Sequence, residues 1–153
     1  MNTLNLILRI VLATGCGALI GIDREYRTKA AGFRTHVLVA LGSALCMVVS
    51  MYGFEEVRRL SGASFDPSRI ASQVVTGIGF IGAGTILFQK NSVRGLTTAA
   101  GLWVTAAIGL ACGAGLYWIA GVATLLVLLC LEGFNYFLRH MNRRGDKNEE
   151  AEM

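Results

Sequence analysis

Charged residues are scarce in this chain of 153 residues: Asp, Glu, Lys and Arg make up 16% of it, against about 25% in an ordinary soluble domain. The charges are also grouped, into residues 23–34, 55–69, 90–94 and 132–152, whereas a soluble domain spreads them over its surface. Proline occurs once. This composition excludes a disordered tail, a secreted disulfide scaffold, a basic nucleic-acid module and a typical cytosolic enzyme.

Side chains that carry chemistry are also few. His36 and His140 are the only histidines, neither lies in a metal-ligand or triad-like pattern, and no Walker A lysine is present. All four cysteines fall inside apolar runs without a C-x-x-C spacing, which is typical of small buried hydrophobes. We therefore expect no enzyme activity, no cofactor, no disulfide and no nucleic-acid partner.

What the chain has instead is a series of uncharged runs. A helix needs about 20 apolar residues to cross a hydrocarbon core of roughly 30 Å. Residues 4–22 contain only Arg9, and residues 35–54 and 70–89 contain no charge. The 37 residues 95–131 are also uncharged, but one helix of that length would reach about 55 Å. We split this run at residues 113–116, before the interfacial pair Tyr117 and Trp118.

These runs predict an all-α fold, a polytopic membrane bundle of five transmembrane helices. Five spans place ten Lys and Arg residues on one side of the membrane, against Arg58, Arg59 and Arg69 on the other. Because cytoplasmic loops carry the excess of Lys and Arg, the N-terminus is expected outside and the C-terminus in the cytoplasm. The transmembrane domain covers residues 1–138, with helices at about 4–22, 35–54, 69–89, 96–113 and 116–138, and a charged cytoplasmic tail follows at 139–153.

Glycine is abundant, with 19 residues, and it recurs at short spacings. The G-x-G-x-x-G spacing within residues 77–84 is not a dinucleotide-binding turn, because it lies in an apolar 20-mer and no acidic residue follows before Glu132. Small residues instead let membrane helices approach closely, within one chain or between two copies. The candidate helix-packing residues are Gly17, Gly21, Gly77, Gly79, Gly82, Gly84, Gly109 and Gly113.

A polar stripe follows one side of the predicted helix 69–89. Asp66 and Pro67 suit its N-cap and first position. Because a polar face is costly against lipid, we expect the stripe to face the bundle or a wet cavity. Two roles are then open: the stripe forms hydrogen bonds between helices, or it lines a vestibule for an ion or small solute. The candidate intramembrane polar residues are Ser72, Gln73, Thr76, Thr97, Thr98 and Glu132.

The first cytoplasmic loop has the densest chemistry. If the first helix continues past residue 22, Asp23 with Arg27 and Glu25 with Lys29 are i,i+4 pairs. Asp23 lies at the edge of the hydrocarbon, where a carboxylate needs a partner, and Arg34 is the nearest cation at the second helix. A structural pair and a functional site are both open. The candidate functional or partner-binding residues are Asp23, Arg24, Glu25, Arg34, Thr35 and His36.

Two charges lie inside predicted spans. Arg9 is one to two turns below the outer surface, so we expect its long side chain to extend out of the hydrocarbon. Glu132 lies deep in the last span, where an acid is a functional-site hypothesis by default. A local polar stripe with Asn135 and Arg139 is the competing interpretation.

Four ordered blocks of the chain resemble the MgtC/SapB family of bacterial inner-membrane proteins: residues 21–25 (GIDRE), 32–36 (GFRTH), 73–84 (QVVTGIGFIGAG) and 93–103 (VRGLTTAAGLW). The resemblance implies a multi-pass inner-membrane protein associated with adaptation to low magnesium and, in virulence-linked members, with survival inside host cells. In those members an inhibitory contact with the F-type ATP synthase has been proposed. Many members carry a soluble C-terminal domain, and we expect the shorter form without it.

The leading hypothesis is a regulator of cation (magnesium) or membrane-energy homeostasis that acts through membrane partners. The alternative is a small-cation transporter or channel that uses the polar face, and a third is a structural assembly subunit. The expected partners are the lipid bilayer, a membrane protein, a second copy of the chain as a homodimer, and a divalent cation.

Overall fold

The computed structural model describes residues 2–54, 66–89 and 92–132. Within these ranges the chain forms five helices and one hairpin. The helices are α1 (Thr3–Tyr26), α2 (Phe33–Tyr52), α4 (Ser68–Gly84), α5 (Leu96–Ala114) and an unlabelled helix, Tyr117–Glu132. The strands β1 (Leu87–Gln89) and β2 (Ser92–Arg94) pair antiparallel, with Phe88 opposite Val93.

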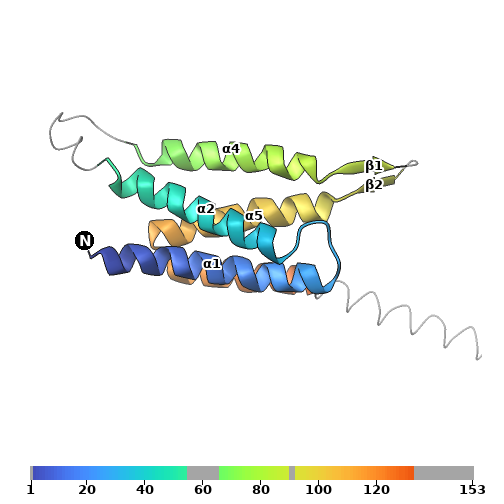
Figure 1. Ribbon diagram of the computed structural model, residues 1–153, viewed down its shortest axis with the longest axis horizontal. Helices are drawn as coiled ribbons and strands as arrows, with labels where there is room; N and C mark the ends of the chain where they lie inside the picture. Colours follow the sequence, from blue (N-terminus) through green and yellow to red (C-terminus); the bar gives the residue numbers. More distant parts are fainter. Residues whose placement is uncertain (1, 55–65, 90–91, 133–153) are drawn as a thin grey trace, which may run out of the picture.

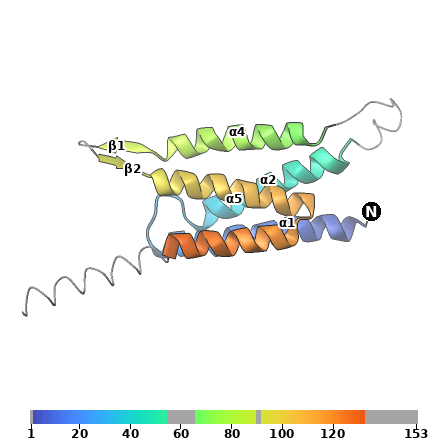
Figure 2. The ribbon, with the colours of Figure 1, turned by 180° about the vertical axis from the view of Figure 1, so that it is seen from behind.

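The helices run side by side along one long axis (Figure 1). α5 lies among its neighbours, α4 covers one side of the bundle, and the helix Tyr117–Glu132 runs beside α1 (Figure 2). The connection from α1 to α2 and the β1–β2 hairpin lie at the same end, opposite the N-terminus (Figure 1). We refer to this end as the hairpin end.

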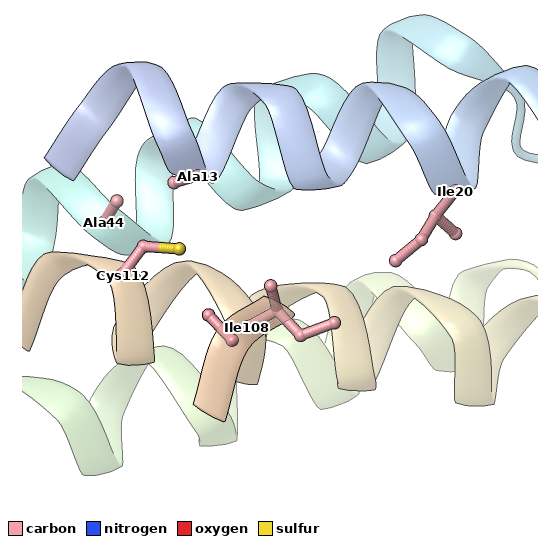
Figure 3. Close-up of a cluster of buried hydrophobic side chains, with 6 residues drawn as sticks. Ala13, Ile20, Ala44, Ile108 and Cys112 are labelled. Carbon is pink, nitrogen blue, oxygen red and sulfur yellow. The ribbon is translucent and has the colours of Figure 1, made fainter. Parts of the chain in front are cut away.

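Small side chains let the three long helices approach closely. Ala13 of α1, Ala44 of α2 and Cys112 of α5 gather at one level between the helices, and Ile20 and Ile108 fill the space further along (Figure 3). All five are buried. Because lipid is as apolar as these side chains, close van der Waals contact is what such a core contributes to stability.

The glycines that were expected to pack helices divide into two groups. A Cβ added at Gly17 would lie 2.7 Å from the His36 carbonyl oxygen, and one at Gly109 would lie 2.4 Å from the Ala40 carbonyl oxygen. Gly21 and Gly113 are equally tight, against Phe33 and Ala44. These four positions bring α1 and α5 against α2 with backbone in direct contact.

On α4 the expectation does not hold within the described chain. A Cβ added at Gly77, Gly79 or Gly84 would meet no atom within 4 Å, and at Gly82 it would make ordinary contact with Ala99 at 3.6 Å. The helix packs instead through a line at i,i+4 spacing, in which Val74 and Ile78 contact the buried cluster that contains Leu102 and Ala106 of α5. That line turns the other glycines away from the bundle.

Three helices are long and apolar enough to cross a membrane, namely α1, α2 and α5. α4 has 17 residues, and the apolar helix Tyr117–Glu132 is also shorter than these three. The helical architecture is as predicted, whereas the five crossings and the orientation stay predictions. Residues 55–65, the end of the last predicted span at 133–138 and the predicted tail at 139–153 lie outside the described residues.

The predicted helix 69–89 is wrong at its end, because α4 stops at Gly84 and the chain enters the hairpin. Thr85 ends the helix by donating its backbone N–H and its hydroxyl to the Gly82 carbonyl, at 3.0 and 2.7 Å. Gly95 then starts α5 with φ of +93°. α4 starts at Ser68 with Pro67 at the N-cap, one residue later than expected, and Asp66 Oδ1 still accepts a hydrogen bond of 2.9 Å from the Ser68 N–H.

Arg9 is buried inside the bundle, an environment that its place in the sequence did not predict. Its side chain is buried, and Nη1 donates a hydrogen bond of 2.8 Å to the carbonyl of Gly113 while Nε donates to Asn5. The ring of Tyr52 lies 5.2 Å from the guanidinium carbon. The last carbonyls of α5 lack intrahelical partners and mark the negative end of its dipole, so a cation there is stabilised.

Candidate functional site at the hairpin end

Arg27 joins two acidic side chains from different helices. Its Nε donates to Asp23 Oδ1 at 2.8 Å, and its Nη2 donates to Glu132 Oε1. The hydrogen bonds to Glu132 and Asp23 raise the pKa of the Arg27 guanidinium above its usual value, so this residue stays charged. The pair Asp23–Arg27 is the i,i+4 pair that the sequence indicated, and the pair with Arg34 is not formed.

Glu132 is not the isolated intramembrane acid that its place in the sequence indicated. Its side chain is 55% exposed and pairs with Arg27. The helix Tyr117–Glu132 runs beside α1 (Figure 2), and its last residue, Glu132, contacts Arg27, which directly follows α1. The depth of a residue in the bundle therefore depends on how far its helix is shifted along the neighbouring helices. Here that shift places the Glu132 carboxylate at the hairpin end.

Glu25 caps the start of α2 instead of pairing with Lys29. Its Oε2 accepts a hydrogen bond of 2.9 Å from the backbone N–H of Phe33. A carboxylate is stabilised there by the positive end of the helix dipole. A Cβ added at Gly32 would lie 1.7 Å from this oxygen, so glycine is needed for the carboxylate to reach the helix.

Arg24 is the buried cation of the site. It is 4% exposed, and its Nη2 donates a hydrogen bond of 3.2 Å to the hydroxyl of Thr98 in the first turn of α5. Its Nε has no partner among the residues that the structure describes. One end of α1 is thereby connected to the start of α5 by a charged side chain.

His36 is fully buried where α1, α2 and α5 meet. Its Nδ1 lies 2.9 Å from the carbonyl oxygen of Gly32, one turn earlier in α2. Its Nε2 has no partner within the described ranges. A Cβ added at Gly101 would lie 3.7 Å from Nε2, so the small residue on α5 leaves space for the ring. The histidine thus serves as a packed polar side chain at the crossing.

Some of the predicted site residues stay apart from this cluster. Arg34 is exposed and Thr35 is half-buried. On α4, Ser72, Gln73 and Thr76 face away from the bundle, which corrects the expectation that they point into it. Two of their hydroxyls donate to their own helix, from Ser72 to the Arg69 carbonyl at 2.7 Å and from Thr76 to the Ser72 carbonyl at 3.0 Å. The apolar line of α4 faces α5, and that contact sets the rotation of the helix.

Between the end of α1 and the start of α5 lies a pocket of about 640 Å³. No sequence pattern predicted this pocket, although Gly95 lies within the block 93–103 and the charge group 90–94 precedes it. No described group of three or more His, Cys, Asp or Glu side chains is placed to hold a metal ion. The pocket is lined by Arg24, Lys29, Val93, Gly95, Leu96, Thr97, Thr98, Cys130 and Leu131.

Known proteins match most of this chain. A family model described as the MgtC family covers residues 10–140. The chain belongs to the MgtC family. "Putative magnesium transporter YhiD" of Escherichia coli K12 is 52% identical over 143 residues, which are 92% of this chain and 66% of YhiD. "Protein MgtC" of Brucella abortus strain 2308 is 48% identical over 112 residues, 73% of this chain and 44% of that protein. No solved structure gives a significant match.

The chain thus spans about two thirds of YhiD and less than half of the Brucella protein. Three of the four blocks that resemble the family, 21–25, 32–36 and 93–103, meet at the hairpin end of this MgtC-family chain. They contribute Arg24, His36 and Thr98, which lie at the meeting point of α1, α2 and α5. The fourth block, 73–84, forms most of α4 and lies along the side of the bundle.

The two acids that Arg27 joins are expected to differ in their effect on stability. Asp23→Asn is expected to lower the free energy of unfolding more than Glu132→Gln, because the Asp23 side chain is 10% exposed and that of Glu132 is 55% exposed. Unfolding of the purified protein in bicelles measures both. Equal losses would mean that burial does not set the strength of this bridge.

Proposed function

We propose that this MgtC-family chain is a multi-pass protein of the bacterial inner membrane that regulates cation (magnesium) or membrane-energy homeostasis through membrane partners, without catalysis. The observation that carries the proposal is the charged cluster at the hairpin end. Arg27 joins α1 to the helix Tyr117–Glu132, Glu25 caps α2, and Arg24 contacts α5. A partner that binds there meets the ends of four helices at once.

The distribution of charge supports the proposed orientation. The described cations at the hairpin end are Arg24, Arg27, Lys29, Arg34 and Arg94, against Arg9 and Arg69 toward the opposite end. By the positive-inside rule, the hairpin end faces the cytoplasm. The exposed Arg34 and the exposed ring of Tyr26 then belong to a surface that a cytoplasmic or membrane partner can contact. The name of the chain's relative, "Putative magnesium transporter YhiD", supports magnesium as the relevant ion.

Asp23→Asn tests this function. In a strain whose deletion slows growth at low magnesium, the variant is expected to grow like the deletion even when its abundance is matched to that of the wild type, because the site loses one of the two carboxylates that hold Arg27. The matched control is Asp66→Asn at the opposite end, where asparagine still caps the helix, and growth should stay normal. Normal growth of the Asp23→Asn strain at normal protein abundance would overturn the proposal.

A small-cation transporter is the second candidate, and the outward face of α4 favours it. Ser72, Gln73 and Thr76 are exposed there beside Gly77, so a second copy of the chain that covered this face would enclose a polar path. Reconstituted protein would then carry Mg²⁺ into liposomes at a rate that Gln73→Leu reduces. Flux equal to that of empty liposomes, under several gradients and potentials, would eliminate this candidate.

A further inference from the structure

We propose that the pocket at the hairpin end binds a phosphate group, supplied either by inorganic phosphate or by the headgroup of an anionic phospholipid. The proposal concerns a ligand site and does not depend on the regulatory function proposed above. It rests on three features of the lining: the start of α5, the buried guanidinium of Arg24 and the charge balance of the pocket.

The start of α5 presents backbone donors to the pocket. The first N–H groups of a helix, here at Gly95, Leu96, Thr97 and Thr98, have no intrahelical acceptor. α5 has no side-chain cap, since its N-cap residue is Gly95. The same four residues line the pocket. A helix start whose N–H groups lack intrahelical acceptors, at the positive end of a 19-residue dipole, is a ready site for an anion.

Arg24 is the second, independent observation. It lines the same pocket and is 4% exposed, and its Nε lacks a partner among the described residues. Its Nη2 contacts the Thr98 hydroxyl, so the guanidinium lies at the first turn of α5. A buried cation is costly unless an anion and hydrogen-bond acceptors satisfy it. Guanidinium matches the oxygens of a phosphate group in charge and geometry.

The charge of the pocket is positive. Lys29 adds a second cation to the lining, and none of the described lining residues is acidic. Of the nearby carboxylates, Asp23 Oδ1 and Glu132 Oε1 are held by Arg27, while Asp23 Oδ2 has no partner among the described residues. Val93, Leu96 and Cys130 complete an apolar part of the lining, which leaves room for a phosphate that carries a substituent. Arg24, Lys29, backbone N–H groups and threonine hydroxyls form a donor set typical of phosphate recognition.

Two exposed cations at the hairpin end make a matched pair for the test. Lys29 lines the pocket, whereas Arg34 is not among its described lining residues, and both residues are exposed. Lys29→Gln and Arg34→Gln remove the same charge. The full chain in neutral detergent is titrated with inorganic phosphate, with sodium chloride at equal ionic strength as the blank, and thermal stability reports binding. In a second arm the protein is placed in nanodiscs of phosphatidylcholine with or without phosphatidylglycerol.

Phosphate is expected to raise the melting temperature of the wild type beyond the chloride blank. Lys29→Gln should weaken the apparent affinity by about tenfold, the loss of one hydrogen bond to a charged group. Arg34→Gln should leave it unchanged. If stabilisation and its loss in Lys29→Gln occur only with phosphatidylglycerol, the ligand is a lipid headgroup. Stabilisation by neither phosphate nor phosphatidylglycerol, or equal weakening in both variants, would overturn the site.

Discussion

Gly109→Ala is expected to destabilise the bundle by about 3 kcal/mol or more, because α2 and α5 touch through backbone at this position. The new Cβ would lie 2.4 Å from the Ala40 carbonyl oxygen and 2.8 Å from the Ser43 Cβ. Neither atom is the end of a flexible side chain, so the two helices must separate along their contact. Unfolding of the purified protein in bicelles, together with its abundance in membranes, measures the loss.

Gly77→Ala is the matched control on α4. Its added Cβ would meet no atom within 4 Å, and alanine is the better helix former by about 1 kcal/mol, so stability should stay equal or rise. If both variants lose stability equally, glycine content rather than helix contact sets the stability. If Gly77→Ala alone breaks a dimer while the monomer remains folded, the outward face of α4 is an interface between copies.

Gly95→Ala is expected to cost about 3 kcal/mol or more, through two separate effects. At φ of +93° an L-residue pays the left-handed penalty of about 1–2 kcal/mol. In addition, its Cβ would lie 2.0 Å from the Thr85 carbonyl oxygen, so the hairpin would have to move away from α5. Because Gly95 lines the pocket, phosphate binding should fall together with stability.

Gly115→Ala separates the two effects, since Gly115 also has positive φ, of +87°. Its added Cβ would meet the flexible end of Arg9 at 3.1 Å rather than backbone. This variant should therefore lose only the conformational part, about 1–2 kcal/mol. Thermal unfolding of both proteins in the same detergent gives the comparison. A loss in Gly115→Ala as large as that in Gly95→Ala would remove the argument from the Thr85 contact.

The pairing of charges at the hairpin end shows what neighbours in sequence can and cannot predict. Asp23–Arg27 followed from i,i+4 spacing on a helix that continues to Tyr26. Glu25 also had an i,i+4 partner, Lys29, yet it contacts the start of α2. The chain turns back between Tyr26 and Phe33, and that turn decides which donor is nearer. Spacing along the helix therefore predicts which ion pairs can form, and the path of the backbone determines which of them do.

The misplaced residues share one physical cause. The sequence predicts the environment of a side chain from its depth or its face in a single helix. This applied to Arg9, Glu132 and the stripe Ser72–Thr76. A helix can rotate about its axis and shift along it, and contacts with other helices fix both. The Val74–Ile78 line against α5 turned the α4 stripe outward, and the alignment beside α1 brought Glu132 to Arg27.

By itself the sequence determined the all-helical architecture, the apolar runs of α1, α2 and α5, and the grouping of charge at their ends. These follow from hydropathy and backbone hydrogen bonding within one segment, so they need no knowledge of neighbours. Only the tertiary structure decided which glycines bring backbones together and that Arg24, Lys29 and the start of α5 enclose one pocket. Those outcomes depend on contacts between residues far apart in the chain, which set the rotation and level of each helix.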